Sequence, residues 1–116
     1  MKPNYTQTTA LSVEIAAERF AALGSPHRLQ VLRALVRAGD AGLAIGELGK
    51  RVGITGSTLT HHMKILVSAG LASQHKQGRS VICAAVDFDQ IAVLSQYLLA
   101  KCCADCSVES AADTYE

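Results

Sequence analysis

The chain has 116 residues, a formal net charge of +1 and 49% hydrophobic residues, and this length predicts one domain with an aliphatic core. No segment approaches the ~18 uninterrupted apolar residues of a membrane span, and the polar stretch Met1 to Ala10 lacks the apolar core of a secretion signal. We therefore expect a cytoplasmic protein without a membrane partner.

The charges are distributed unevenly along the chain. Residues 48–86, the basic stretch, contain no Asp or Glu but carry Lys50, Arg51, Lys64, Lys76 and Arg79 together with three histidines. The acidic residues that follow are accompanied by one cation, Lys101. A local basic surface on a small protein most often binds nucleic acid, and a merely solvated basic face is the alternative on charge alone.

Two amphipathic helices are predicted at the start of the domain. The first runs from Ser12 to Leu23 and ends at Gly24, with one apolar face formed by Ile15, Ala16, Phe20 and Leu23. Ser25 and Pro26 then supply an N-cap hydroxyl and a proline at the first helical position. The buried stripe of this second helix is predicted to be Leu29, Leu32, Leu35 and Val36.

A helix-turn-helix pattern follows. Ile45, Leu48 and Val52 have the spacing of a short helix, and Gly53-Ile54-Thr55 predicts a tight turn into a fourth helix that ends at Ala69. Two helices joined by about three turn residues that include Gly are typical of this motif.

A hairpin and a last helix complete the predicted fold. Segments 72–76 and 79–86 flank Gln77-Gly78, a dipeptide suited to a hairpin turn, and the second segment is rich in Val and Ile. Asp87 and Gln90 form a candidate capping box for a helix whose apolar positions are Ile91, Leu94 and Leu98. The fold class is therefore α+β, mostly α, in the form of a winged helix-turn-helix with a two-stranded wing.

The fourth helix has two distinct faces. If Leu59 points inward, about 100° per residue places Met63 and Leu66 on the same side and turns polar side chains outward. Hydroxyls and amines on such a face can contact phosphates or base edges in a DNA major groove. His62 lies nearer the buried side, so it is either a structural histidine or a DNA contact. The candidate DNA-binding residues are Ser57, Thr58, Thr60, His61, His62 and Lys64 on the helix, with Lys76 and Arg79 on the wing.

Residues 56–66, followed by Ser68-Ala69-Gly70-Leu71 and by Gly78-Arg79, resemble the ArsR/SmtB family of winged-helix repressors. Residues 22–29 are similar to the start of that family's second helix, so the resemblance covers about residues 16–99. It implies a homodimer formed through the first and last helices, a double-stranded operator with two half-sites, and release of DNA when an effector binds. A two-fold dimer that places two such helices about 34 Å apart predicts a palindromic operator.

Three cysteines, Cys102, Cys103 and Cys106, lie together near the end of the predicted last helix. At spacings of three and four residues on a helix their side chains are neighbours, and three thiolates select soft, thiophilic ions. Some repressors similar to this chain bind arsenite or antimonite through three cysteines at the last helix. This resemblance implies As(III) or Sb(III) as the effector, held by Cys102, Cys103 and Cys106, and no required cofactor.

The chain also departs from the family in two places. Residues 44–49, on the third helix, contain no cysteine where the better-known thiol site of the family lies, and no histidine follows His75, which a zinc site on the last helix would need. Other soft ions, namely Cd, Pb or Hg, and redox or reactive-sulfur sensing stay open as alternatives. Cys83, on the second strand of the wing, is expected to be a core residue.

An enzyme is the alternative from another functional class. Cys103 and Cys106 form a Cys-x-x-Cys pair of the kind found in thiol oxidoreductases, but no βαβ pattern surrounds it. We therefore expect a regulator and not an enzyme. The expected domain boundaries are a disordered segment at residues 1–11, the DNA-binding and dimerisation domain at residues 12–106, and an acidic disordered tail at residues 107–116.

Overall fold

The computed structural model describes residues 11–106. Apart from Leu11, the segments for which disorder is predicted lie outside these described residues. Leu11 is half-buried and packs against the hydrophobic core.

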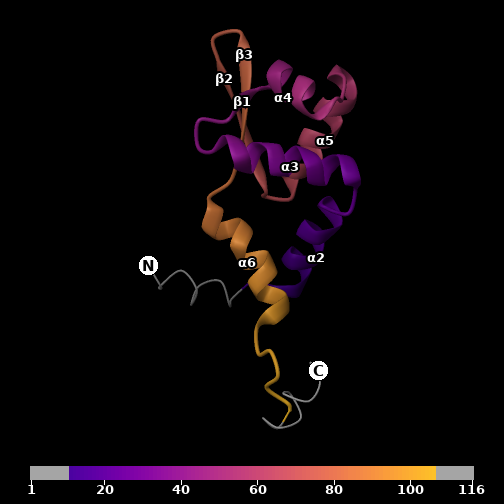
Figure 1. Ribbon diagram of the computed structural model, residues 1–116, viewed down its shortest axis with the longest axis vertical. Helices are drawn as coiled ribbons and strands as arrows, with labels where there is room; N and C mark the ends of the chain where they lie inside the picture. Colours follow the sequence, from indigo (N-terminus) through magenta and orange to yellow (C-terminus); the bar gives the residue numbers. More distant parts are fainter. Residues whose placement is uncertain (1–10, 107–116) are drawn as a thin grey trace.

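The described chain forms five helices and a small antiparallel sheet (Figure 1). In chain order the elements are α2 (Val13–Ala22), α3 (Pro26–Ala38), β1 (Leu43–Ala44), α4 (Ile45–Val52), α5 (Gly56–Ser68), β2 (Ala72–Gln77), β3 (Ser80–Ala85) and α6 (Phe88–Leu99). The mostly helical α+β class and the winged helix-turn-helix order are confirmed.

Serine side chains cap both of the first two helices, and the cap at Ser25 was predicted. The Ser12 Oγ accepts a hydrogen bond from the Ile15 amide at 3.1 Å, and the Ser25 Oγ accepts one from the Arg28 amide at 3.3 Å. Each bond satisfies one amide that the first helical turn leaves without a backbone partner. Together with Pro26 at the start of α3, these caps fix where the two helices begin.

The predicted buried stripe of α3 is wrong at two positions. Leu32 and Leu35 are buried, but Leu29 and Val36 are 45% and 42% exposed, and Val31 is fully buried instead. At about 100° per residue, Val31, Leu32 and Leu35 share one side of the helix, whereas Leu29 and Val36 lie together at its edge. The sequence pattern allowed either side to face the core.

The helix-turn-helix agrees with its prediction. Gly53 ends α4 in the left-handed conformation, with φ of 71°, and α5 begins three residues later. Leu59, Met63 and Leu66 of α5 are buried in the core beside Leu48 of α4. Burial of a Leu or Met side chain contributes roughly 1.5–3 kcal/mol, so this packing fixes the rotation of α5 about its axis.

The sheet has the order β1-β3-β2, and the β2–β3 hairpin is the wing. Gln77 pairs with Ser80, so the turn residues are Gly78 and Arg79 and not the predicted Gln77-Gly78. Gly78 has φ of 66°, which suits a glycine at the first central position of a type II′ turn. Strand β1 was not predicted because it contains two residues; a side chain on Gly42 beside it would overlap the Cys83 carbonyl.

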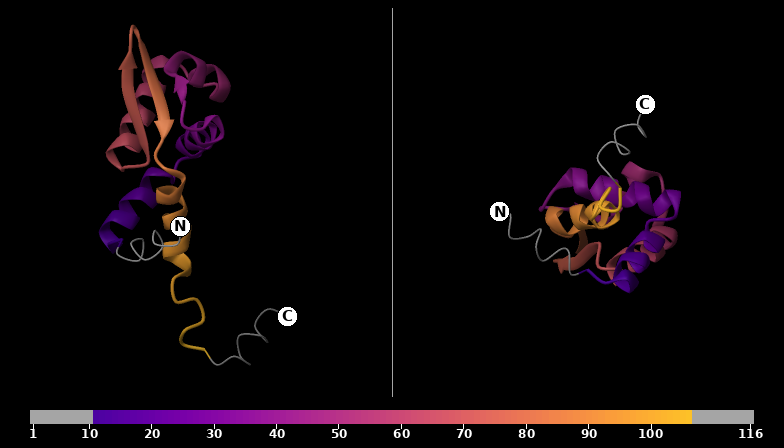
Figure 2. Two further views of the ribbon diagram at one scale, coloured as in Figure 1. Left: turned by 90° about the vertical axis from the view of Figure 1, so that its left-hand side faces the viewer. Right: turned by 90° about the horizontal axis from the view of Figure 1, so that it is seen from below.

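Helices α2 and α6 pack against each other at the end of the molecule opposite the wing tip (Figure 2). Val93 and Leu94 of α6 are buried, whereas Leu98, the last of the predicted apolar positions, is 69% exposed. The predicted capping box is also wrong, because the Asp87 side chain makes no cap hydrogen bond. Helix α6 forms without a side-chain cap because the burial of Val93 and Leu94 stabilises it.

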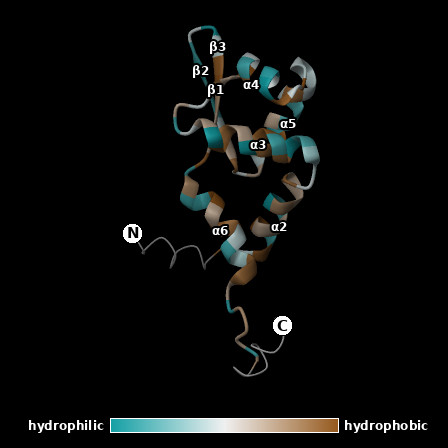
Figure 3. Ribbon diagram, viewed as in Figure 1, coloured by the Kyte–Doolittle hydropathy of each residue, from teal (hydrophilic) through white to brown (hydrophobic). Residues whose placement is uncertain are grey.

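Several apolar side chains remain exposed on the described surface, and Figure 3 shows the hydrophobic residues of α2 and α6 at this end. They include Val13 and Ile15 of α2 and Phe88, Leu98 and Leu99 of α6. None of the described helices is long and apolar enough to cross a membrane.

Candidate nucleic-acid interface

The face of α5 that points away from the core is polar and exposed. Ser57, His61, Lys64 and Ser68 recur at intervals of four, three and four residues and are all exposed, on the side opposite the buried Leu59 and Met63. Ser68 was not among the predicted site residues, although the same helical spacing could have identified it. This ridge presents hydroxyl, imidazole and amine groups together.

Two threonines flank this ridge near the start of α5. Thr58 and Thr60 are both exposed. The Thr60 hydroxyl donates a hydrogen bond to the Gly56 carbonyl at 3.0 Å, which leaves its oxygen lone pairs available to an outside donor. Thr60 can therefore accept a hydrogen bond at the protein surface.

His62 lies on the side of α5 that meets the start of α3. Its ring is half-buried and stacks on the ring of His27, with centroids 5.7 Å apart and an interplanar angle of 23°. Its Nδ1 atom is buried and has no hydrogen-bond partner among residues 11–106. Burial, followed by the positive charge of Arg28 and by His27 and His61, lowers the pKa of His62 below its ordinary value. The half-buried position agrees with a structural role for this ring.

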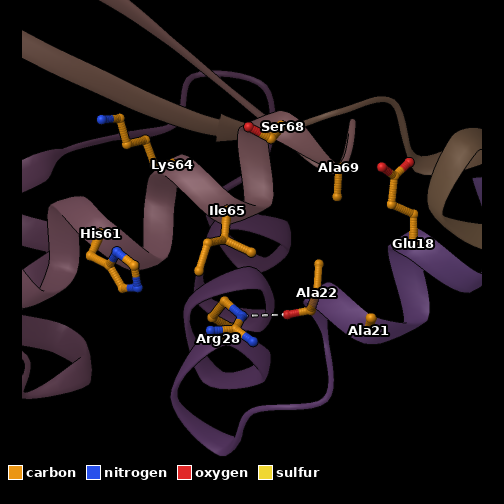
Figure 4. Close-up of a pocket in the computed structure, with 9 residues that line it drawn as sticks. All are labelled: Glu18, Ala21, Ala22, Arg28, His61, Lys64, Ile65, Ser68 and Ala69. Carbon is orange, nitrogen blue, oxygen red and sulfur yellow. Dashed lines mark hydrogen bonds between the residues drawn. The ribbon is translucent and has the colours of Figure 1, made fainter.

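An open groove runs along α5 on this side (Figure 4). This groove, called the α5 groove below, is lined by His61, Lys64, Ile65 and Ser68 of α5 and by Glu18 and Arg28 of α2 and α3. The Arg28 Nε donates to the Ala22 carbonyl at 2.6 Å, which holds the guanidinium at the groove wall. Arg28 was not among the predicted site residues. Residues 25–28 indicated only the start of a helix, and the proximity of Arg28 to α5 is set by tertiary packing.

The wing carries the two remaining predicted cations. Lys76 lies on β2 opposite Val81, and Arg79 occupies the hairpin turn itself. Both side chains are exposed. The wing therefore presents two long cationic side chains near its tip, and these belong to a different element from the ridge of α5.

The cysteines do not lie on a helix, which corrects the prediction. Helix α6 ends at Leu99, and residues 100–106, the thiol segment, form exposed turns in which Lys101 and Cys103 have φ of 65° and 64°. The helix ends there because no residue of the thiol segment is buried against the core. The spacing of three and four residues therefore does not bring the three side chains together as it would on a helix.

Two of the three thiols are nevertheless in contact. The Cys102 and Cys103 Sγ atoms are 3.6 Å apart, and the hydrogen bond with Cys102, then its charge, raises the pKa of the Cys103 thiol. Within residues 11–106, no group of three or more His, Cys, Asp or Glu side chains is placed to hold a metal ion. Three thiols suit a soft ion, but only those of Cys102 and Cys103 are in contact in this structure.

Cys83 is separate from this cluster. Its side chain is fully buried in the core, as expected, and burial raises the pKa of its thiol. A buried thiol with a raised pKa is a poor nucleophile and a poor ligand.

Known proteins share this fold and part of this sequence. Residues 23–75 match a helix-turn-helix domain family. YceK, an HTH-type transcriptional regulator of Bacillus subtilis (strain 168), is 36% identical over 67 residues, which are 58% of this chain and 66% of YceK. The matched segment thus spans slightly less than two thirds of that relative.

Two solved structures extend the comparison. The crystal structure of the ArsR family transcriptional regulator RHA00566 is 28% identical, with a TM-score of 0.64 over 77% of this chain and 88% of that one. The homodimeric winged helix-turn-helix DNA-binding domain of Mb0332 from Mycobacterium bovis is 22% identical, with a TM-score of 0.61 over 80% of this chain and 81% of that one, and shows the fold alone. The chain therefore has a winged helix-turn-helix fold and is similar to RHA00566, an ArsR family transcriptional regulator, and to the transcriptional regulator YceK.

Proposed function

We propose that this protein is a cytoplasmic repressor that binds a palindromic operator as a homodimer and releases it when As(III) or Sb(III) binds Cys102, Cys103 and Cys106. The observation that carries the DNA-binding part is the division of α5 into a buried apolar side and an exposed polar ridge. The contact of two thiols just beyond α6 supports the effector part.

The polar ridge gives α5 the chemistry of a DNA-reading helix. A helix fits the major groove, where hydroxyl and imidazole groups such as those of Ser57, Thr58, Thr60 and His61 can hydrogen-bond base edges or phosphates. Lys64, Lys76 and Arg79 add cations for phosphate contacts, and Arg79 at the wing tip can reach a neighbouring groove. The absence of Asp and Glu from residues 48–86 removes repulsion of the duplex from this surface.

The apolar face of α2 and α6 supports dimerisation with a second copy. Val13, Ile15, Leu98 and Leu99 are large apolar side chains at one end of the molecule and are exposed in the single chain. Their burial against the same residues of a partner would form a two-fold interface. The homodimeric domain of Mb0332, which has the same fold, supports this arrangement. Two α5 helices about 34 Å apart would then meet successive turns of the operator.

Effector binding would act through the thiol segment. Cys102 and Cys103 are already in contact, so both can bind one As(III) or Sb(III) centre, and for each sulfur bound one hydroxide ligand leaves as water with the thiol proton. Exchange of the third hydroxide for Cys106 would replace the present turn conformation. Since the segment follows α6 directly, this rearrangement would change the proposed dimer interface and the separation of the two α5 helices. A coupling of about 1–3 kcal/mol between the two sites is typical and would release the operator.

Thiol oxidation is the second candidate. A two-electron oxidant, such as a peroxide or a polysulfide, could join the neighbouring Cys102 and Cys103 sulfurs or modify one of them. The raised pKa of Cys103 disfavours this residue as the attacking thiol, because the thiolate is the reactive species. Metalloid binding displaces the thiol protons and depends less on a thiolate present beforehand.

A DNA-binding titration tests the proposal. A labelled duplex selected by the protein from a random-sequence pool is titrated by fluorescence anisotropy, without and with arsenite, antimonite, Cd, Pb, Hg or polysulfide. We expect arsenite or antimonite to weaken binding by about 5- to 150-fold. Cys102→Ser, Cys103→Ser and Cys106→Ser should each abolish this response without changing the affinity for DNA. If these variants still respond to arsenite, the effector part of the proposal is wrong. If the protein selects no duplex, the whole proposal is wrong.

A further inference from the structure

The α5 groove is a cationic surface beside the ridge of α5. Arg28, His61 and Lys64 line it, and Glu18 is the one carboxylate among its lining residues (Figure 4). His61 and Lys64 belong to the ridge as well, so the groove opens directly beside the surface proposed to enter the major groove. The charge and position of the groove fit a phosphate of the strand that borders that major groove.

Three imidazoles meet at the edge of the same surface. His62 stacks on His27 at 5.7 Å, and the ring centroids of His61 and His62 are 5.8 Å apart. The buried Nδ1 atom of His62 has no hydrogen-bond partner, so nothing within the described chain stabilises a proton on this atom. These three rings, His27, His61 and His62, are called the imidazole cluster below; imidazole is the side chain whose charge responds most readily to a nearby charge between pH 5 and 8.

We propose that the α5 groove holds a phosphate of the bound duplex between Arg28, His61 and Lys64, and that the imidazole cluster takes up a proton as this phosphate binds. The inference rests on the proposed DNA-binding function and adds to it a phosphate contact and a pH dependence. The partner is double-stranded DNA, recognised here by its phosphodiester charge.

The direction of the pH dependence follows from the charges around the cluster. In the free protein, protonation of His62 is opposed first by burial, then by the positive charge of Arg28, and then by the neighbouring His27 and His61, the groups that act on it from α3 and α5. A phosphate in the groove adds a negative charge that favours protonation of the same rings. DNA binding must therefore strengthen as the pH falls, by about tenfold per pH unit for each proton taken up.

The first test measures this linkage in the full-length protein. Binding to the selected duplex is titrated at fixed ionic strength between pH 8.0 and 5.5, and the histidine ring resonances of the free and DNA-bound protein are followed by NMR over the same range. We expect affinity to rise several-fold toward low pH, and the ring resonances of His62 to titrate at higher pH in the complex than in the free protein. Unchanged midpoints in the complex, or affinity that does not depend on pH, would overturn the inference.

Histidine variants locate the effect. His61→Gln and His62→Gln should each flatten the pH dependence of the affinity, whereas His75→Gln should leave it as in the wild type. His75 is a matched control because it is the fourth histidine of the chain and lies on β2, where it pairs with Ile82. A pH dependence that is lost only in His75→Gln would place the proton elsewhere and overturn the inference.

A charge variant tests the phosphate contact separately from the proton. Glu18→Gln removes the carboxylate from the groove and should strengthen DNA binding by about threefold, since a phosphate beside it would no longer be repelled. Asp40→Asn removes the same charge from the α3–β1 connection and should have a much smaller effect. Equal effects of the two variants would indicate general electrostatics and would overturn the proposed contact.

The outcomes distinguish this inference from the proposed function. DNA binding that persists in all variants but shows no pH dependence would remove the inference and leave the DNA-binding function intact. Failure to bind any duplex at any pH would remove both.

Discussion

Two regions of the molecule position their side chains in different ways. One is the head, formed by α4, α5 and the wing, and the other is the thiol segment. In the head, Leu59, Met63 and Leu66 are buried, and this packing fixes which side of α5 faces outward. In the thiol segment every residue is exposed, and two thiols are in contact while the segment has no helical order. The side chains of the head are therefore positioned by burial in the core, whereas the proposed effector would have to bring the three thiols together.

Core truncation gives the largest expected difference between the two regions. Leu66→Ala should lower the free energy of unfolding by about 3 kcal/mol, because it removes a fully buried side chain and leaves a cavity. Chemical denaturation measures this change. Val67→Ala on the same helix, where the side chain is 37% exposed, is the control and should stay within about 0.5 kcal/mol of the wild type. Equal losses would mean that α5 is not oriented as described.

Two cysteines, the buried Cys83 and the exposed Cys102, allow the same comparison of the two regions with one residue type. Cys83→Ser should lower the free energy of unfolding by about 2 kcal/mol, because it places a hydroxyl without a known partner in the core. Cys102→Ser should change it by less than about 0.5 kcal/mol because this side chain is exposed. Thermal and denaturant unfolding of both variants would sharpen the comparison, and a larger loss in Cys102→Ser would break it.

Removal of a cation should separate the regions in DNA binding. Lys64→Gln is expected to weaken binding to the selected duplex by about fivefold and to reduce the slope of log affinity against log salt by about 1, as for the loss of one phosphate contact. Lys101→Gln removes the same charge from the thiol segment and should leave both quantities nearly unchanged. Anisotropy titrations at several salt concentrations provide the measurement. The contrast fails if Lys101→Gln has the larger effect.

The smallest expected effect is the pH dependence of stability from His62. Burial, with the charges of Arg28, His27 and His61, lowers its pKa in the folded state below the ordinary 6.5, so the unfolded chain binds more protons in this range. The free energy of unfolding should therefore fall as the pH drops below about 6.5. His62→Gln should reduce this fall, and His75→Gln should not. A steeper fall in His62→Gln would contradict the lowered pKa.

Much of the fold follows from local sequence patterns. The serine caps of α2 and α3, Gly53 between α4 and α5, and the spacing of Leu59, Met63 and Leu66 each specify a local conformation through nearby residues. The outward face of α5 follows from the same periodicity. These features depend on interactions within one or two helical turns, which the order of residues determines directly.

Only the tertiary structure decided which side of α3 is buried, where the wing turns and where α6 ends. Leu29 and Val36 fit a helical stripe as well as Val31 does, and the packing of neighbouring elements chose between them. The stacking of His62 on His27 joins residues from α5 and α3 and follows from no local pattern. The cysteine spacing suggested a helical cluster, but α6 ends where burial ends, because short helices in proteins depend on packing for their stability.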